Sequence, residues 1–126
     1  MDNEDLKKRL TEEEYFITQE KGTETPFRNE YWDKKESGMY ECKVCGQTLF
    51  DSSRKYDSGT GWPSFDEALP GVLKFEQDHS LGTVRTEVMC ARCGSHLGHI
   101  FDDGPKETTG KRICTNSASL RFKSKS

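Results

Sequence analysis

The segment Cys42-Lys43-Val44-Cys45-Gly46 decides the fold of this 126-residue chain, together with its counterpart Cys90-Ala91-Arg92-Cys93-Gly94. In each segment two residues separate a pair of cysteines, so that one tight turn can aim both sulfurs at a single ion. Two such turns complete a closed set of four thiolates, which is typical of structural zinc and leaves no position for water. We therefore predict one structural Zn²⁺ that joins two distant hairpins through Cys42, Cys45, Cys90 and Cys93.

Two alternatives to this zinc site stay open. The paired cysteines can instead be redox-active or simply buried, because Cys-x-x-Cys pairs also occur in thiol oxidoreductases. The spacing also does not separate zinc from iron, although the form of the turn favours zinc. No motif in the chain indicates an organic cofactor.

The composition indicates one small, polar domain spanning residues 1–126, with a frayed tail at 123–126. Charged residues make up 33% of the chain and hydrophobic ones 31%, so the core is modest and a metal would help to hold it. A net charge of −3 provides no overall basic field for nucleic acid or anionic lipid. Neither a membrane helix nor a signal peptide is indicated. We expect a cytoplasmic monomer in a reducing compartment, with an organellar location as the alternative.

Periodicity divides the chain into a helical start and a β-rich remainder. Residues 3–19 carry a helical pattern, with Leu6 and Leu10 four apart and a capping box from Thr11 to Glu14 that opens a second short helix. Glycine and proline then predict an irregular segment up to Gly38. Alternating apolar and polar residues predict a mainly β remainder, with a turn at 80–82 and strands at 39–43, 48–50, 72–77, 83–89, 97–101, 111–116 and 119–123.

Cys114 is the only cysteine outside the two pairs. If residues 111–116 form a strand, Arg112, Cys114 and Asn116 share one face of it. A nearby guanidinium favours the thiolate, and Asn116 supplies a neutral donor on the other side. We therefore predict Cys114 as a nucleophile. The alternative is a small cysteine packed as a hydrophobe.

His96 and His99 follow the second cysteine pair directly. Four thiolates already saturate one ion, so both imidazoles are left for proton transfer, and Gly98 lets the backbone bend so that both can face one cleft. The alternative is a pair of ordinary hydrogen-bonded or surface histidines. In the loop at 59–65, Pro63 restricts Trp62 to extended conformations. Trp62 and Phe65 either cap the core or form one wall of an apolar pocket beside the thiol.

Six motifs in order, spanning about residues 11–123, make the chain resemble the B-type methionine sulfoxide reductases, the methionine-R-sulfoxide-specific family. They are Gly-Thr-Glu at 22–24, Glu-Tyr-Trp at 30–32, Gly-Trp-Pro-Ser-Phe at 61–65, Arg-Thr-Glu-Val at 85–88, His-Leu-Gly-His-Ile-Phe at 96–101 and Cys-Thr-Asn-Ser-Ala-Ser-Leu-Arg-Phe at 114–122. The resemblance implies a mainly β fold of two antiparallel coiled sheets, tent-like, with short N-terminal helices and a four-cysteine zinc clip.

The resemblance also implies an activity, the reduction of the R epimer of methionine sulfoxide in proteins or peptides. The thiolate would attack the sulfoxide sulfur and become a sulfenic acid, while nearby donors protonate the oxygen. The family's roles fall on a nucleophile, two imidazoles, a cation, an amide and a methyl-binding indole: Cys114, His96, His99, Arg112, Asn116 and Trp62.

Two positions depart from the family's pattern. Many members carry a resolving cysteine where this chain has Thr60, and the other four cysteines are assigned to metal. We therefore expect a one-cysteine enzyme whose sulfenic acid is reduced by an external thiol, either thioredoxin or a small thiol. Ile113 replaces an aromatic residue that is common in the family, and no consequence is attached to it. The competing interpretations are a non-catalytic zinc-clipped β scaffold with an aromatic cage, and a zinc-ribbon adaptor, which the acidic charge disfavours.

Overall fold

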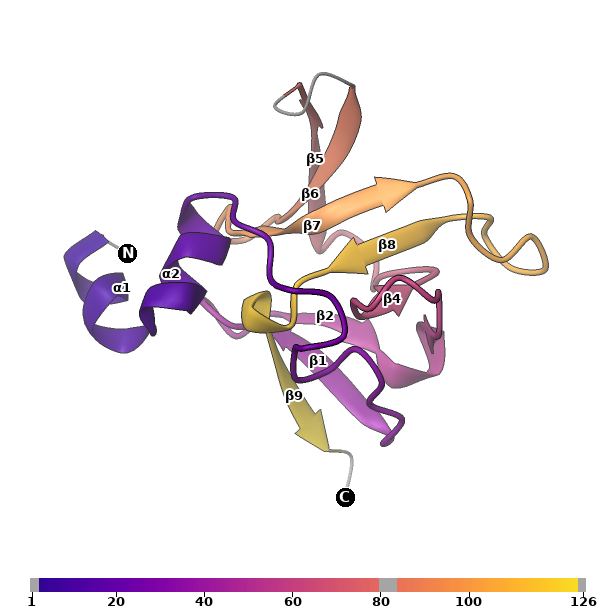
Figure 1. The fold of residues 1–126 in the computed structure, drawn as a ribbon, viewed down its shortest axis with the longest axis horizontal. Coiled ribbons are helices and arrows are strands. Elements are labelled where there is room, and N and C mark those ends of the chain that lie inside the picture. Colours follow the sequence, from indigo (N-terminus) through magenta and orange to yellow (C-terminus); the bar gives the residue numbers. More distant parts are fainter. Residues whose placement is uncertain (1–2, 80–83, 125–126) are drawn as a thin grey trace.

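The computed structural model describes residues 3–79 and 84–124, and within them it contains two antiparallel sheets with two short helices at one end (Figure 1). Strands β2, β1 and β9 form a three-stranded sheet, and a six-stranded sheet has the order β3-β4-β8-β7-β6-β5. The elements are α1 (Asn3–Arg9), α2 (Glu12–Gln19), β1 (Gly38–Cys42), β2 (Thr48–Asp51), the 3₁₀ helix η1 (Ser52–Arg54), β3 (Lys55–Tyr56), β4 (Ser64–Phe65), β5 (Leu73–Asp78), β6 (Arg85–Cys90), β7 (His96–Phe101), β8 (Arg112–Thr115), the 3₁₀ helix η2 (Ser117–Ser119) and β9 (Leu120–Ser124).

The predicted mainly β fold with two antiparallel sheets and N-terminal helices is confirmed. Every predicted strand has a counterpart within one or two residues at each end, but the two-residue strands β3 and β4 were not predicted. The predicted turn at 80–82 lies outside the described residues. In the part of the chain that the structure describes, no helix has the length and apolar character needed to cross a membrane.

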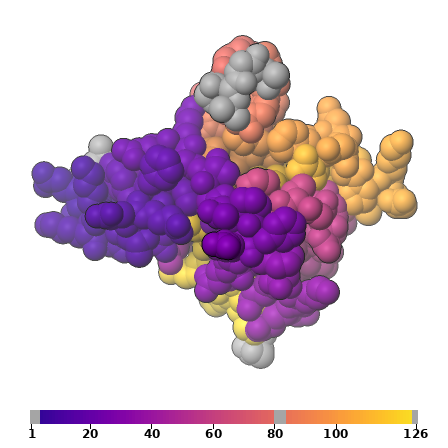
Figure 2. Space-filling model, in the orientation of Figure 1, coloured from indigo at the N-terminus to yellow at the C-terminus, as the bar shows by residue number. Residues whose placement is uncertain are grey.

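Helix α2 begins at the predicted capping box. The Thr11 hydroxyl accepts a hydrogen bond from the Glu14 amide at 3.1 Å, and the Glu14 carboxylate accepts one from the Thr11 amide at 2.9 Å. The two helices then contact the first cysteine turn, because Arg9 donates to the Val44 carbonyl at 2.8 Å and Glu14 pairs with Lys43 at 3.2 Å. The helices form one end of the molecule, and the β7–β8 connection projects at the opposite end (Figure 2).

The hydrophobic core lies between the two sheets. Tyr40, Leu49 and Phe50 enter it from the three-stranded sheet and are fully buried. Phe65 enters it from β4, with its ring stacked on Phe50 at a centroid distance of 4.1 Å. Phe65 is therefore a core residue, which decides one of the two readings of the 59–65 loop for this side chain.

The opposite face of the six-stranded sheet carries a row of polar side chains. The register makes Ser64 the Cα partner of Cys114, Cys114 that of His99, and His99 that of Glu87. Directly opposed residues of antiparallel strands project to the same face, with Cβ atoms about 5 Å apart. The sheet thus brings together a thiol, an imidazole, a hydroxyl and a carboxylate that are far apart in the sequence.

A β-bulge in β7 allows both histidines to lie on this face. The pairing shifts between Val88 and Met89, which oppose Gly98 and His96, so β7 carries one additional residue. The rings of His96 and His99, three residues apart, consequently meet edge to face with centroids 5.5 Å apart. Gly98 is required for a different reason than the predicted bend. A Cβ at this position would lie 1.8 Å from the Cys114 carbonyl oxygen, so β8 can approach only a glycine.

We therefore expect Gly98→Ala to lower the free energy of unfolding by about 3 kcal/mol, the upper end for overpacking, and to displace Cys114. Urea denaturation measures the loss. Gly71→Ala is the control, since an added Cβ there meets nothing within 4 Å and only the φ of 73° opposes it. Its expected cost is about 1 kcal/mol. Equal losses in the two variants would contradict the close approach of β7 and β8.

Candidate active site and metal centre

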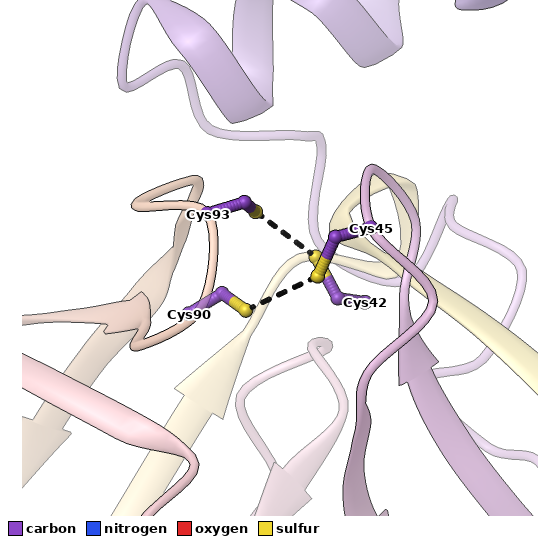
Figure 3. A group of neighbouring side chains, drawn as sticks. All are labelled: Cys42, Cys45, Cys90 and Cys93. Atoms are coloured by element: carbon purple, nitrogen blue, oxygen red, sulfur yellow. Dashed lines mark hydrogen bonds between the residues drawn. The ribbon is translucent and has the colours of Figure 1, made fainter. Parts of the chain in front are cut away.

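The four paired cysteines form one cluster between the two sheets (Figure 3). Their sulfurs all lie within 4.8 Å of one another, and the Cys42–Cys93 and Cys45–Cys90 distances are both 3.6 Å. Sulfurs placed tetrahedrally 2.3 Å from a zinc ion are separated by about 3.8 Å. The observed spacing therefore fits a single ion, and each of the two close pairs joins one cysteine turn to the other.

The electrostatics of the cluster also favour a cation. Hydrogen bonds among the thiols act in opposite directions, because they raise the pKa of Cys42 and lower the pKa of Cys93. Four thiolates at this spacing need a cation to compensate their charge. Ser95 lies 3.2 Å from the Cys93 sulfur and accepts a hydrogen bond from Gln19 of α2 at 3.1 Å. Such outer contacts orient metal ligands. The cluster therefore ties the β1–β2 turn, the β6–β7 turn and α2 together.

A cavity of about 250 Å³ lies over β7 and β8 on the polar face of the six-stranded sheet. It brings together five of the six residues predicted for catalysis or substrate binding: Cys114, His99, Arg112, Asn116 and Trp62. His96 is not among its lining residues and is 3% exposed. The prediction that both imidazoles face one cleft is therefore wrong for His96, which is buried beside the His99 ring.

The environment of Cys114 opposes its ionisation in the free protein. Burial raises the pKa of the Cys114 thiol, against the lowering effects of the Arg112 charge and of hydrogen bonds with Thr60 and Ser64. The predicted effect of Arg112 has the right sign, but burial outweighs it. The hydroxyls belong to a small network, in which Ser58 lies 2.7 Å from both Thr60 and Ser64. Thr60 thus places a hydroxyl beside the thiol.

Arg112 is held in place from two sides. Its guanidinium donates to both carboxylate oxygens of Asp103, at 2.8 and 3.2 Å, and stacks on the Phe101 ring at 4.2 Å. A bidentate pair of this kind fixes both the position and the charge of the guanidinium. Because Arg112 lies on the cavity wall with Cys114 and its charge acts on the thiol, it is a cation available to a thiolate.

Arg112→Gln is expected to raise the pKa of Cys114 further, because the favourable charge is lost while burial remains. The fraction of thiolate then falls at any given pH below the pKa. Alkylation by iodoacetamide should be roughly tenfold slower at pH 8, and its rate–pH curve should move to higher pH. Lys111→Gln is the matched control, since the neighbouring Lys111 also pairs with an aspartate, Asp102, but does not line the cavity. An unchanged curve for Arg112→Gln would contradict this role.

Asn116 does not serve the thiol in the way that was predicted. Its amide nitrogen donates to the Leu97 carbonyl at 3.3 Å, and its oxygen accepts from the Glu24 amide at 3.2 Å. Strand β8 ends at Thr115, so Asn116 has already left the alternation on which the prediction rested. The side chain joins β7 to the 22–24 segment and still borders the cavity.

The two histidines are each paired with a carboxylate. His99 Nε2 lies 2.7 Å from Asp78 Oδ2, and His96 Nδ1 lies 2.8 Å from Glu87 Oε2. Burial lowers the pKa of His96, while the hydrogen bond to Glu87 opposes that change. Asp78 and Glu87 were not predicted as site residues. Glu87 lies in the Arg-Thr-Glu-Val motif at 85–88, whereas the only signal of Asp78 in the sequence is its place at the end of a predicted strand.

Glu24 is a further residue that the sequence did not single out beyond its motif. Its carbonyl accepts from the indole of Trp62 at 2.9 Å, and its carboxylate accepts from the amides of Ser117 and Ala118 at the start of η2. Burial raises the pKa of this carboxyl, and the two amides oppose that shift. One buried residue thereby fixes Trp62 as a cavity wall and anchors the chain directly after β8.

Most of the chain matches the sequences of known proteins. The model of the SelR domain matches residues 10–124. "Peptide methionine sulfoxide reductase MsrB" of Synechococcus sp. (strain RCC307) is 55% identical over 122 residues, covering 96% of this chain and 89% of that protein. "Methionine-R-sulfoxide reductase B3, mitochondrial" of Mus musculus is 53% identical over 120 residues, covering 94% of this chain. This chain spans 47% of the mouse protein's length.

A solved structure shares the fold at low sequence identity. The crystal structure of the Mis18 "Yippee-like" domain superposes with a TM-score of 0.58 over 72% of this chain and 99% of that one, at 18% identity. This likeness concerns the fold alone. The family follows from the sequence matches and from the cavity that gathers the motif residues. The chain belongs to the SelR domain family, the family of the B-type methionine sulfoxide reductases.

Proposed function

We propose that this chain, acting as one domain over residues 1–126, reduces the R epimer of methionine sulfoxide in proteins or peptides to methionine. The observation that carries the proposal is the cavity in which one thiol, one imidazole and one indole meet. Relatives named as peptide methionine sulfoxide reductases, of which the chain covers 87% to 89%, support it.

The residue types in the cavity suit this reaction. The indole of Trp62 offers an apolar wall to the methyl group of the sulfoxide, and Arg112 stabilises the thiolate of Cys114 as it attacks the sulfur. His99 donates a proton to the sulfoxide oxygen, and His96 supports that ring from the buried side. The thiol and the sulfoxide thus become a sulfenic acid and a thioether. The S–O bond of the sulfoxide breaks and the oxygen is transferred to the Cys114 sulfur, so the cysteine sulfur loses two electrons and the methionine sulfur gains them.

The sulfenic acid is reduced from outside the chain in this proposal. Thr60 provides a hydroxyl where a resolving cysteine would be needed, and the four remaining cysteines form the metal cluster. Two external thiols then convert the sulfenic acid to thiol and water and leave as a disulfide. Thioredoxin and small thiols both fit this step.

Zn²⁺ is the ion that we assign to Cys42, Cys45, Cys90 and Cys93. The close spacing of the four sulfurs and the all-thiolate donor set favour it. Four protein ligands complete its coordination, so the ion would stabilise the link between the sheets and supply charge compensation to the thiolates.

Turnover of separated R and S sulfoxides of a methionyl peptide tests the function. With dithiothreitol as donor, only the R epimer should be reduced, and thioredoxin or glutathione in its place identifies the donor class. Equal turnover of both epimers would reject the proposal. Binding of the peptide without any turnover would favour the aromatic-cage binding module. Trapping a Cys114 disulfide within the chain as a species of the cycle would reject the one-cysteine mechanism.

A further inference from the structure

Asp78 lies at the border of the proposed active site, but the reaction as described above does not use it. It is the last residue of β5, its Cα partner is Arg85 at the start of β6, and it is 9% exposed. Its carboxylate oxygen lies 2.7 Å from His99 Nε2. An ionised carboxylate can only accept hydrogen bonds, so the ring nitrogen that faces it carries the hydrogen.

The contact with Asp78 determines which nitrogen His99 can offer to a substrate. Nε2 is engaged by the carboxylate, so Nδ1 is the ring atom left for the cavity that His99 lines with Cys114. An imidazolium that donates from Nδ1 becomes the neutral ring with its hydrogen on Nε2. That tautomer is the one that a carboxylate at Nε2 stabilises. Asp78 therefore suits both the state before proton transfer and the state after it.

Arg85 contacts the carboxylate from the side of the cavity rim. Its guanidinium lies 3.4 Å from the same oxygen of Asp78, and its side chain is 26% exposed. A charge-assisted contact of this kind helps to orient the carboxylate, which accepts from the imidazole with the same oxygen. Arg85 also lines the cavity, so the three side chains form a continuous chain of polar contacts from the rim to the imidazole.

The second carboxylate–imidazole pair differs in a way that separates the two roles. Glu87 binds His96 through Nδ1, and the two side chains are only 1% and 4% exposed. His96 does not line the cavity. The chain therefore holds its two imidazoles by opposite ring nitrogens, and only the one held through Nε2 borders the thiol.

We propose that Asp78 is a positioning residue of the reductase, which fixes the tautomer and orientation of His99 so that Nδ1 delivers the proton to the sulfoxide oxygen. The inference rests on the proposed reduction of methionine sulfoxide. Its structural part, the state of the His99 ring, can be read without any substrate.

Asp78→Asn tests this role, because an amide nitrogen turned toward the ring favours the other tautomer. Single-turnover reduction of the R-sulfoxide peptide should slow by about 100-fold, the scale of general acid catalysis, with little change in substrate affinity. Alkylation of Cys114 by iodoacetamide should keep its wild-type rate, because it needs the thiolate but no proton donor. Asp78→Glu should recover part of the loss. Glu76→Gln is the matched control, since it removes the same charge from the same face of β5 at an exposed position.

A wild-type reduction rate in Asp78→Asn would overturn the proposal, and so would a parallel loss of alkylation and melting temperature, which indicates a purely structural role. The ¹⁵N chemical shifts of the His99 ring in the wild-type protein give a test that needs no variant. The hydrogen is expected on Nε2, and a neutral ring with its hydrogen on Nδ1 would overturn the proposal. If the wild type fails to reduce the R epimer, the proposed function falls, while the ring measurement still decides how Asp78 holds His99.

Discussion

Cys114→Ser is expected to lower the rate of R-methionine sulfoxide reduction by about 10⁴-fold or more, the scale seen when an enzyme loses its nucleophile. A serine hydroxyl is almost isosteric with the thiol but does not ionise near neutral pH and does not form a sulfenic acid. The surroundings of residue 114 include the hydroxyls of Thr60 and Ser64, so a serine should be accommodated without loss of stability. Single-turnover kinetics with each epimer measure the effect, and a thermal melt checks the fold.

Binding of the R-sulfoxide peptide supplies the control for this variant. The indole of Trp62 and the imidazole of His99 are untouched, so Cys114→Ser should bind the peptide with an affinity within a few-fold of the wild type. Reduction that survives the substitution would remove Cys114 from the role of nucleophile. Loss of binding together with loss of turnover would instead show that the substitution had disturbed the cavity.

Removing the metal is expected to unfold the protein. Structural zinc contributes about 10–16 kcal/mol in zinc-finger peptides, which is comparable to the whole stability of a small domain, about 5–15 kcal/mol. The cluster joins the β1–β2 turn to the β6–β7 turn, and hence the two sheets whose contact forms the core. Far-UV circular dichroism during titration with a strong chelator measures the loss, with one equivalent of zinc released for each chain.

Cys90→Ser should reproduce the effect of the chelator, because it removes one of the four ligands. The Cys114→Ser variant provides the comparison, since it removes a thiol outside the cluster and should respond to the chelator as the wild type does. A chelator-treated protein that keeps its melting temperature would contradict the structural role of the ion.

Local signals in the sequence were sufficient for the parts of the fold that local chemistry decides. The capping box at Thr11, the two cysteine turns and the alternation in the strands each depend on neighbours within a few residues, and the structure confirms them. The gathering of the cysteines is confirmed, and the identity of the ion stays a prediction. Strands β3 and β4 were not predicted because a strand of two residues shows no periodicity in the sequence.

The errors at the candidate site come from properties that depend on the whole fold. Burial raises the pKa of the Cys114 thiol by more than the charge of Arg112 lowers it, and this burial results from the packing of the sheets. The bulge in β7 brings His96 beside His99, but His96 does not line the cavity. The spacing of two histidines in the sequence does not predict whether a buried ring borders a cavity. Asp78 lies 21 residues from its partner His99, so its role follows only from the register of β5, β6 and β7.

The cysteine cluster makes the proposed reaction depend on reductants from outside the chain. The chain has five thiols, and four of them would be protected from oxidation once they bind an ion. In the proposed reaction Cys114 then has no second free cysteine, among the residues that the structure describes, to reduce its sulfenic acid. The rate at which damaged methionines are reduced would therefore depend on the concentration of reduced thiols around the protein. The protein would work fastest in a compartment that keeps its thiols reduced.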